Sequence, residues 1–470
     1  MTTALFQELT TTLGLLYALL LTGMFLRAKV PLFRRLLLPS SVIGGFLGLI
    51  LGPSVMGDSA ILPFSTETIT TWSLIPGILI LPIFASVPLG SGMEGSEVKS
   101  VKSNLPRVLL VCGLFSIAGG IQSTIGFGFT LVMSKLMPSL DLYRTFGFEM
   151  NQGFSGGHGT AGGLGYTLQS FDLDYWEVAQ GVATTFATVG LIGGMLLGIF
   201  FINRGARTGK TQLMDSPSDL PPIILFGFSK DKNQQPSLGR ETTNSSSIET
   251  ITVHLGLIMM VSALSYYLNG LARTHDIFGL SSVPVWFYGL LMMYGVNFMI
   301  KKLGLEWLID KKVKIRIVGA LSDLAIVSAM ASVNIKAVST YLVPIIILSI
   351  LGFLSTYVLT FPLYRYFFGK NDYYFERAIM SWGVNTGVTI NGMMLLKICD
   401  PNYETPALTD FSMAFALMSL TSIFTYPITF SLIATGTTFQ LFAFMVASTF
   451  IYIAMAVVGG IMLRKSAPEQ

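Results

Sequence analysis

Charged residues are scarce in this chain. Asp, Glu, Lys and Arg make up 11% of its 470 residues, whereas 52% are hydrophobic. A soluble domain carries about 25% charged residues, so this composition excludes an ordinary soluble protein and indicates a polytopic membrane protein. The formal net charge of +4 is small, and the basic residues stand in short loops beside apolar runs. That distribution is typical of membrane orientation rather than of nucleic-acid binding.

Cysteines and catalytic motifs are scarce as well. Cys112 and Cys399 are the two cysteines, and both lie in or near apolar segments, so we expect buried free thiols and no metal site built on them. The chain has no H-E-x-x-H motif, no nucleophile elbow and no pair of intramembrane aspartates. We therefore expect no catalytic residue and no organic cofactor. No A-x-A-like cleavage site follows the first apolar run, which predicts a retained span.

Long apolar runs are what the chain does have. A membrane helix needs about 20 mostly apolar residues, and this predicts an all-α polytopic fold. The expected spans are 8–27, 37–56, 72–91, 106–134, 178–202, 250–272, 283–301, 316–334, 337–367, 410–434 and 438–463.

Lysine and arginine in the loops predict the orientation of these spans. Basic residues gather at 27–35, 99–107, 204–210 and 301–316, which predicts that these loops are cytoplasmic. The acidic loops around Asp58 and at 172–177 carry no basic residue and are expected outside. The amino terminus is then outside, and Arg464 and Lys465 place the carboxyl terminus in the cytoplasm.

A polar stretch at 203–248 divides the chain into two halves. Ser, Asn, Gln, Pro and charged residues dominate it, which is typical of a linker and predicts a cytoplasmic connection. Residues 1–202 and 249–435 each hold five expected crossings and one Gly-rich interruption. Because five is odd, the two halves must have opposite orientation, as in transporters built from inverted repeats. Residues 436–470 form an extra helix and a tail outside the repeat.

The first interruption is NQGFSGGHGTAGGLG at 151–165. Irregular backbone at membrane depth persists only where it is buried in protein or lines a polar cavity. The loop charges favour a re-entrant hairpin near 144–169 that enters and leaves on the outer side. Glycine lets backbone approach a ligand, and a helix that starts inside the membrane offers unpaired N–H groups to a carboxylate. The predicted substrate-binding residues here are Ser155, Gly156, Gly157, His158, Gly159 and Thr160. Close helix packing through small residues is the alternative, and His158 could be a proton carrier, a substrate donor or a structural imidazole.

The second interruption, SWGVNTGVTING at 381–392, is expected to form a re-entrant hairpin near 373–399 that enters from the cytoplasm. Its glycines allow bends and its hydroxyl and amide groups offer neutral oxygens. The predicted substrate-binding residues are Gly383, Asn385, Thr386 and Gly387, and close packing is again the alternative.

Charged residues inside the membrane are rare and each is a functional hypothesis. Glu149 precedes the first interruption, with a water-exposed position at the hairpin base as its alternative. Asp323 stands well inside the eighth apolar run and could serve an ion or a coupled proton. Arg377 is predicted to neutralise a substrate carboxylate, with an anchor at the cytoplasmic edge as the alternative. The predicted Na⁺ ligands are Asn151, Thr160, Asp323, Ser381, Thr389 and Asn391.

A family resemblance rests on the motifs just described. SGGHGT at 155–160, between a fourth and a fifth span, resembles the signature of the bacterial sodium/glutamate symporter family. PSSVIGG at 39–45 resembles that family's second helix, and 370–393 lies where its second re-entrant loop would be. The resemblance runs from the amino terminus to about residue 435. The chain departs from the family's pattern in its second loop, in the charges Glu149, Glu376 and Arg377, in its long linker and in its eleventh span.

The resemblance implies ten spans in two inverted halves, each with a re-entrant loop. It also implies a homodimer in the bacterial inner membrane, in which a transport domain moves against a scaffold. The function it implies is Na⁺-coupled import of glutamate or a related small anionic amino acid, with Na⁺ as coupling ion and no other cofactor. The alternatives are Na⁺- or H⁺-coupled transport of another organic anion, an intramembrane enzyme and a passive channel.

Overall fold

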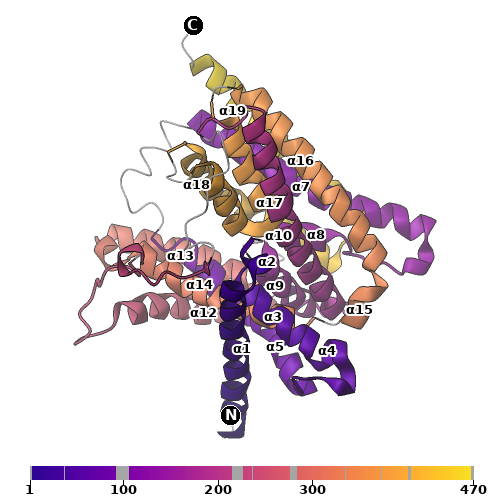
Figure 1. Ribbon diagram of the computed structural model, residues 1–470, viewed down its shortest axis with the longest axis vertical. Coiled ribbons are helices and arrows are strands. Elements are labelled where there is room, and N and C mark those ends of the chain that lie inside the picture. The colour runs from indigo at the N-terminus through magenta and orange to yellow at the C-terminus, as the bar shows by residue number, and fades with distance from the viewer. Residues whose placement is uncertain are drawn as a thin grey trace. The chain divides into compact units, whose positions relative to one another are not determined.

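The computed structural model describes residues 3–35, 38–90, 105–213, 226–235, 237–275, 283–333, 335–370, 372–400 and 404–466 (Figure 1). Every regular element in these ranges is a helix, and nine of the helices are long and apolar enough to cross a membrane. The prediction of an all-α polytopic membrane protein is confirmed. The expected spans 283–301 and 316–334 are helical too but are not among those nine. Cys112 and Cys399 are buried and free, as expected.

Contacts between residues divide the chain into two compact units, each described here by itself. Unit 1 consists of Met1–Glu97, His158–Gln180 and Pro221–Ile335, and unit 2 of Val98–Gly157, Gly181–Leu220 and Lys336–Gln470. Each unit therefore takes segments from both halves of the chain. The division into halves at 1–202 and 249–435 concerns the order of elements along the chain, and it stays a prediction. Residues 214–225 and 236 of the expected linker lie outside the described residues.

Unit 1 is a bundle in which glycine brings helices into close contact. Its helices are α1 (Thr3–Lys29), α2 (Pro31–Arg35), α3 (Ser40–Leu51), α4 (Pro53–Met56), α5 (Thr66–Ser86), all but the first residue of α9 (Gly157–Gln169), α12 (Thr250–His275), α13 (Val285–Lys302) and α14 (Lys311–Ala331). A side chain at Gly44 of α3 would overlap the Leu19 carbonyl of α1, and one at Gly48 would lie 3.0 Å from Ala331 of α14. These three helices lie side by side in Figure 1.

Polar side chains fix where two helices of unit 1 begin. The Ser65 hydroxyl accepts the Thr68 N–H at 3.1 Å at the start of α5. The Asp310 carboxylate accepts the N–H groups of Lys312 and Val313, at 2.8 and 3.0 Å, at the start of α14. Burial opposes ionisation of Asp310, but these hydrogen bonds and one from the Arg240 N–H outweigh it and hold the pKa of the carboxyl below its usual value. Asp310 therefore caps α14 as a carboxylate.

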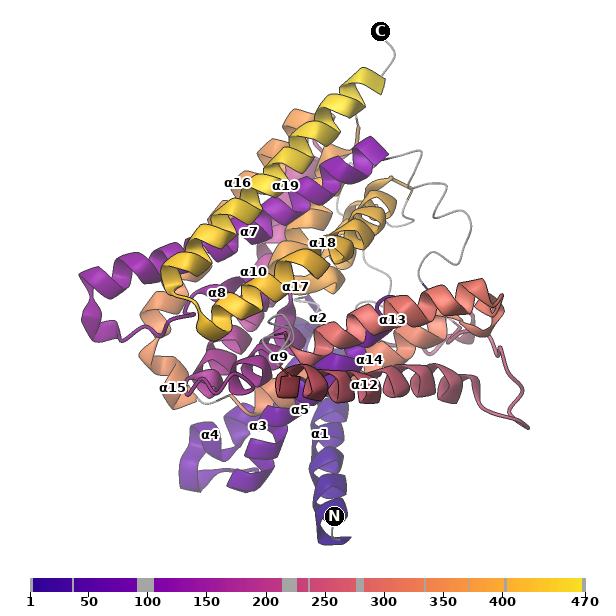
Figure 2. The same cartoon turned by 180° about the vertical axis from the view of Figure 1, so that it is seen from behind.

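Unit 2 is built around the long helix α7. Its helices are α7 (Leu105–Leu136), α8 (Phe148–Phe154), most of α10 (Trp176–Arg207), most of α15 (Ile335–Thr340), α16 (Leu342–Phe368), α17 (Tyr374–Cys399), α18 (Ala407–Thr435) and α19 (Thr438–Ser466). The extra helix α19 runs along α7 (Figure 2). A Cβ at Gly113 would lie 2.5 Å from the Ala456 nitrogen, and one at Gly459 would lie 2.5 Å from the Leu110 nitrogen. Glycine is thus required on both helices for this contact.

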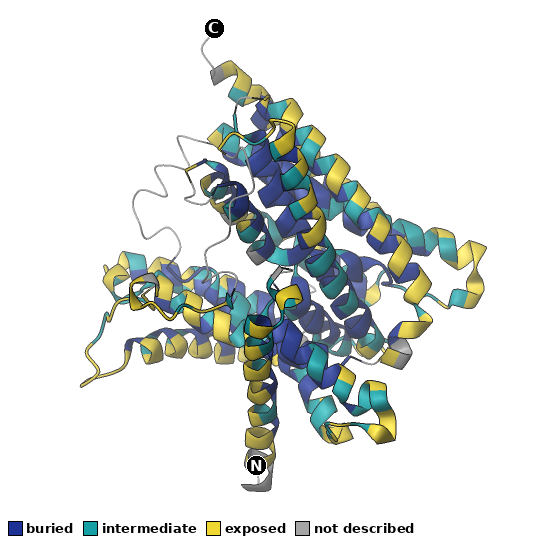
Figure 3. Ribbon diagram, in the orientation of Figure 1, coloured by how far each residue is buried: buried dark blue, intermediate teal, exposed yellow. Residues whose placement is uncertain are grey.

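Many residues of the long helices are exposed (Figure 3), and a large share of these exposed residues are large and apolar. On α16, for example, Ile350, Leu354 and Val358 are all more than half exposed. Their spacing of four residues puts them on one face of the helix. Such faces are what a helix presents to lipid.

Candidate functional site

The first interruption is a broken helix. Helix α8 ends at Phe154, a turn follows at Ser155 and Gly156, and α9 begins at Gly157. Gly157 has φ +70°, a left-handed conformation that glycine adopts without strain. The boundary between the two compact units falls directly after Gly157.

The second interruption breaks α17 at Gly387 and Val388. Gly387 has φ −153° and ψ 37°, and Val388 has φ 61° and ψ 175°. A β-branched residue with a positive φ is strained, and strain of this kind is held only where the surrounding structure enforces it. Two half-helices therefore meet inside α17. The end of one half-helix and the start of the next are where backbone carbonyl and N–H groups lack partners within a helix.

The two breaks meet within unit 2. A Cβ on Gly157 would lie 2.5 Å from Cγ1 of Val388. Glycine at one break and the strained valine at the other are therefore in direct contact. Residues 157 and 388 are 231 positions apart in the sequence and are neighbours in unit 2.

A buried amide of α7 ties the two breaks together. The fully buried Gln122 donates from Nε2 to the Thr356 hydroxyl of α16 at 2.8 Å and to the Asn385 carbonyl of α17 at 2.9 Å. Its Oε1 accepts a hydrogen bond from the Asn151 Nδ2 of α8 at 3.1 Å. Asn385 in turn donates to the Ser381 carbonyl at 3.0 Å. This set, which we call the Gln122 network, gathers three predicted site residues: Asn151, Ser381 and Asn385.

Helix α10 packs directly against the residues around the second break. A side chain at Gly190 would overlap the Thr386 carbonyl, and one at Gly194 would overlap the Thr386 hydroxyl. The Asn391 Nδ2 donates to the Leu191 carbonyl at 2.9 Å. The predicted residues Thr386 and Asn391 are thus in contact with α10, and the amide of Asn391 is already engaged there.

The rest of the first interruption belongs to unit 1. His158 is buried there, while Gly159 and Thr160 are half-buried. A side chain at Gly162 would overlap Pro76 of α5, and one at Gly163 would lie 2.8 Å from Ile80. Close packing therefore explains the glycines in the second half of this segment.

The intramembrane charges are placed in three different ways. Glu149 at the start of α8 is 0% exposed, so the water-exposed alternative is wrong. Asp323 lies at an exposed position of α14 in unit 1. Arg377 is in the first half of α17, about 16 Å along the helix from Val388 at 1.5 Å per residue.

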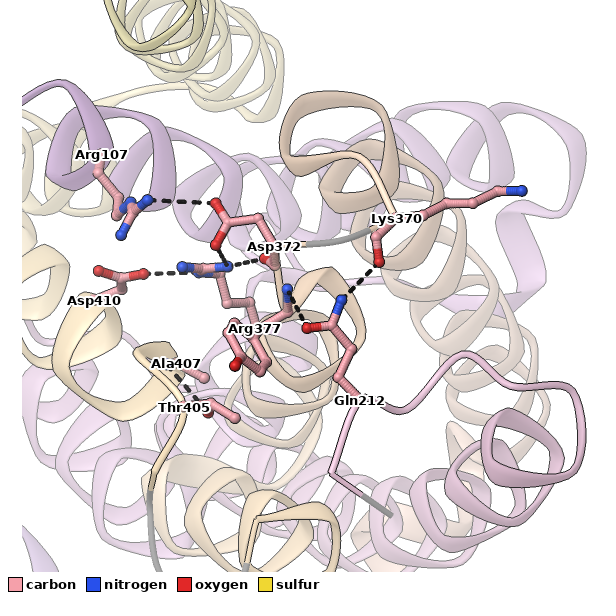
Figure 4. A network of polar contacts seen from close by, with 9 residues as sticks. Arg107, Gln212, Lys370, Asp372, Arg377, Thr405, Ala407 and Asp410 are labelled. Atoms are coloured by element: carbon pink, nitrogen blue, oxygen red, sulfur yellow. Dashed lines mark hydrogen bonds and ion pairs between the residues drawn. The ribbon is translucent and has the colours of Figure 1, made fainter. Parts of the chain in front are cut away.

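Arg377 is engaged by two carboxylates (Figure 4). Its Nε donates to Asp410 of α18 at 2.7 Å, and its guanidinium also contacts Asp372 at 3.2 Å. Asp372 pairs in addition with Arg107 of α7 at 3.3 Å. The guanidinium lies over the Phe368 ring as well. This environment fits a structural anchor, the alternative named for Arg377, better than a free partner for a substrate.

Gln122 and Thr356 are residues of this region that sequence reasoning missed. A signal for Gln122 was present, because an amide in the middle of the apolar stretch 106–134 must find a hydrogen-bond partner. Thr356 had none, since a threonine in a membrane helix can bond to its own backbone. It does so here, donating to the Gly352 carbonyl at 2.7 Å.

Replacing Gln122 by leucine should destabilise unit 2. The change removes three hydrogen bonds and leaves the Asn151 amide and the Asn385 carbonyl without these partners in a buried place, which costs about 1–3 kcal/mol in total. The free energy of unfolding in detergent measures the effect. The loss in free energy of unfolding in the Gln122→Leu/Asn151→Leu double variant should be smaller than the sum of the losses in the two single variants. Additive losses would contradict a shared network.

Comparison with known proteins adds independent evidence. The family model described as sodium/glutamate symporter matches residues 6–404. A protein named sodium/glutamate symporter from Haemophilus influenzae is 26% identical over 251 residues, which cover 52% of this chain and 54% of that protein. The chain thus aligns with about half the length of this curated relative. Because the family model covers most of the chain, the chain belongs to the sodium/glutamate symporter family.

Proposed function

We propose that the protein is a secondary active transporter that couples Na⁺ to the import of glutamate or a related small anionic amino acid. The observation that carries the proposal is the contact between two broken helices, at Gly157 and Val388, beside the Gln122 network. Broken helices inside a membrane protein offer unpaired carbonyls to a cation and unpaired N–H groups to a carboxylate. Membership of the sodium/glutamate symporter family supports this choice of ion and solute.

The predicted residues have the chemistry that this function requires. We propose that the substrate carboxylate is bound by N–H groups at the two breaks of unit 2, in the segments 155–157 and 383–387, and that hydroxyl and amide side chains orient it. The predicted residues 158–160 belong to unit 1 and stay candidates from the sequence alone. Within unit 2, Na⁺ would be held by neutral oxygens from Asn151, Ser381, Thr389 and Asn391. Thr160 and Asp323 belong to unit 1 and stay candidates from the sequence alone. The cation reduces the cost of bringing a carboxylate into a medium of low dielectric, which is the physical reason for coupling the two.

We propose further that transport proceeds by alternating access of the elevator type. Two halves of opposite orientation, each with a re-entrant hairpin, would form a homodimer in the bacterial inner membrane. The amino terminus would be outside and the carboxyl terminus cytoplasmic. The compactness of unit 2, which holds both breaks, supports a carrier that moves as one body.

Uptake in proteoliposomes tests the proposal. Radiolabelled glutamate should accumulate above its external concentration only with an inward Na⁺ gradient, and collapse of the gradient should release it. Equilibration without accumulation would identify a channel, and chemical conversion of the solute would identify an enzyme. Competition by other amino acids and dicarboxylates then defines the substrate.

Coupling to H⁺ is the second candidate, and Glu149 favours it. The carboxyl group is fully buried near the Tyr143 hydroxyl, and Tyr341 is the other titratable group that faces it. No basic side chain pairs with Glu149 in the part of the chain that the structure describes. Arg144 instead donates to carbonyls at the carboxyl end of α18, that of Ile433 in the helix and that of Gly436 directly after it. A buried carboxyl group without a cation is stable in its neutral form.

The variant Glu149→Gln separates the two kinds of coupling, because glutamine resembles the neutral acid. If Glu149 carries a coupled proton, uptake by the variant should continue at a reduced rate and lose its dependence on pH between 5 and 9. If the carboxylate is a Na⁺ ligand, the half-saturating Na⁺ concentration should rise while the pH profile is unchanged. If wild type and variant show the same pH dependence of uptake and the same half-saturating Na⁺ concentration, Glu149 neither carries the coupled proton nor binds Na⁺.

A further inference from the structure

A cavity away from the two breaks lies within unit 2. Its volume is about 450 Å³, and it is lined by the ends of α10 and α16, the start of α17 and the segment that follows α10. Cavities of this size accommodate small organic ligands. On α17 it is lined by Tyr374 and Phe375, which are 14 and 13 residues from the break at Val388.

Positive charge dominates the rim of this cavity. Arg204, Lys210 and Arg365 line it and no acidic residue does. All three side chains are exposed, and none pairs with a carboxylate among the described residues. A fourth cation, Arg464 of α19, lies 5.3 Å from the centre of the Tyr366 ring, which is also part of the lining. Convergent cations without counter-charges indicate a site for an anion.

The floor of the cavity is aromatic and rigid. The Phe201 ring packs against Tyr357 and Phe361, with ring centres 5.0 and 5.2 Å apart, and Phe361 packs against Phe375 at 5.6 Å. These rings belong to α10, α16 and α17. A ligand here would therefore meet an apolar surface below its charged group.

Gln212 holds the wall of the cavity in place (Figure 4). Its Nε2 donates to the Lys370 carbonyl at 2.8 Å, and its Oε1 accepts the Tyr373 N–H at 3.3 Å. Its own N–H donates to Glu376 at 2.8 Å. The segment after α10, which carries Lys210, is thus attached to the connection between α16 and α17.

The apolar surface continues from the cavity along α16. Tyr357 and Pro362 line the cavity, and the exposed face of Ile350, Leu354 and Val358 begins beside them. A soluble anion would contact only the basic cavity, whereas a phospholipid would contact the cavity through its headgroup and the exposed face of α16 through an acyl chain. Basic pockets between membrane helices are suited to the headgroups of anionic lipids.

We propose that this cavity binds the phosphodiester headgroup of an anionic glycerophospholipid, with an acyl chain along the exposed face of α16. The proposal is independent of which solute is transported. The bound lipid would connect the ends of α10 and α16 to the start of α17.

Native mass spectrometry of the purified full-length protein, with added dioleoyl-phosphatidylglycerol, tests the proposal. One molecule of dioleoyl-phosphatidylglycerol should bind per protein, at least about tenfold more tightly than dioleoyl-phosphatidylcholine. The variant Arg204→Gln/Lys210→Gln/Arg365→Gln should lose on the order of 10- to 100-fold in affinity for phosphatidylglycerol. Lys301→Gln/Lys302→Gln/Lys312→Gln removes the same charge outside the cavity and should bind as wild type. If the first variant is not monodisperse, the exposed single variants Lys210→Gln and Arg365→Gln replace it.

Three outcomes would overturn the inference: equal loss in both triple variants, equal binding of the two lipids, or displacement of the lipid by millimolar inorganic phosphate or glycerol 3-phosphate. The last of these would identify a site for a soluble anion. The assay needs neither Na⁺ nor glutamate. If the protein binds no lipid but shows normal Na⁺-driven uptake, only this inference is contradicted. If it binds the lipid but shows no uptake, only the proposed function is contradicted.

Discussion

Na⁺-driven uptake should fall to background when Gly157 is replaced by valine. Gly157 has φ +70°, where a β-branched side chain is strained by about 1–3 kcal/mol. Its Cβ would also lie 2.5 Å from Cγ1 of Val388, a residue that is itself held at φ 61°. Because both backbones are constrained, neither can move away without separating the two breaks. Initial rates in proteoliposomes, at equal amounts of folded protein, measure the effect.

Two further variants show whether this contact is the cause. Gly256→Val makes the same change in α12 at a position with nothing within 4 Å, and it should transport normally. The Gly157→Ala variant should take up substrate more slowly than wild type. Adding Val388→Ala to this variant should restore part of the rate, because the methyl group that faces residue 157 is then absent. Uptake by Gly157→Val with unaltered concentration dependence would contradict the proposal that the two breaks form the site.

The second large effect is expected at Arg377. Its side chain is 1% exposed and that of Asp410 is 3% exposed. Removing Arg377 therefore leaves the Asp410 carboxylate buried without its cation, whereas removing Asp410 leaves Arg377 with only the more exposed Asp372. Breaking a buried pair in this way costs about 3–5 kcal/mol. Arg377→Gln should lower the free energy of unfolding by this amount and Asp410→Asn by less, because Arg377 then keeps Asp372. The double variant should recover most of the loss.

Arg107→Gln is the matched control. Arg107 and Asp372 are 29% and 36% exposed, and an exposed pair contributes about 1 kcal/mol or less. A stable Arg377→Gln protein with a strongly raised half-saturating glutamate concentration would contradict the structural role. It would support the prediction that Arg377 binds the substrate carboxylate.

The helical fold could be predicted because membrane helices leave a simple signal. An apolar run long enough to cross a bilayer can be identified from the local sequence alone, without knowing what it packs against. The runs that begin near 106 and 337 correspond to α7 and α16. The break in α17 was also signalled, by Gly387 among polar residues. Its location at Val388 was not, because the strained conformation of a valine depends on contacts with segments distant in sequence.

Contacts between distant segments limited the prediction of the site. SGGHGT reads as one continuous motif, yet the boundary between the two compact units falls inside it, after Gly157. Arg377 resembles a free intramembrane cation, but Asp410, which lies 33 residues further along, is its partner. The signal for such a pair is in the sequence only as two isolated charges, and their proximity depends on how α17 and α18 pack.

The contact between α7 and α19 has a consequence for biosynthesis. The glycine-lined face of α7 is matched by α19, whose 29 residues begin about 300 residues after α7 ends. At about 5–20 residues per second, the ribosome needs roughly 15–60 s to make that interval. During this time the face of α7 must be covered by lipid or by the insertion machinery. Unit 2 can therefore reach its final packing only after α19 has entered the membrane, so nascent chains arrested before residue 438 should remain sensitive to proteolysis.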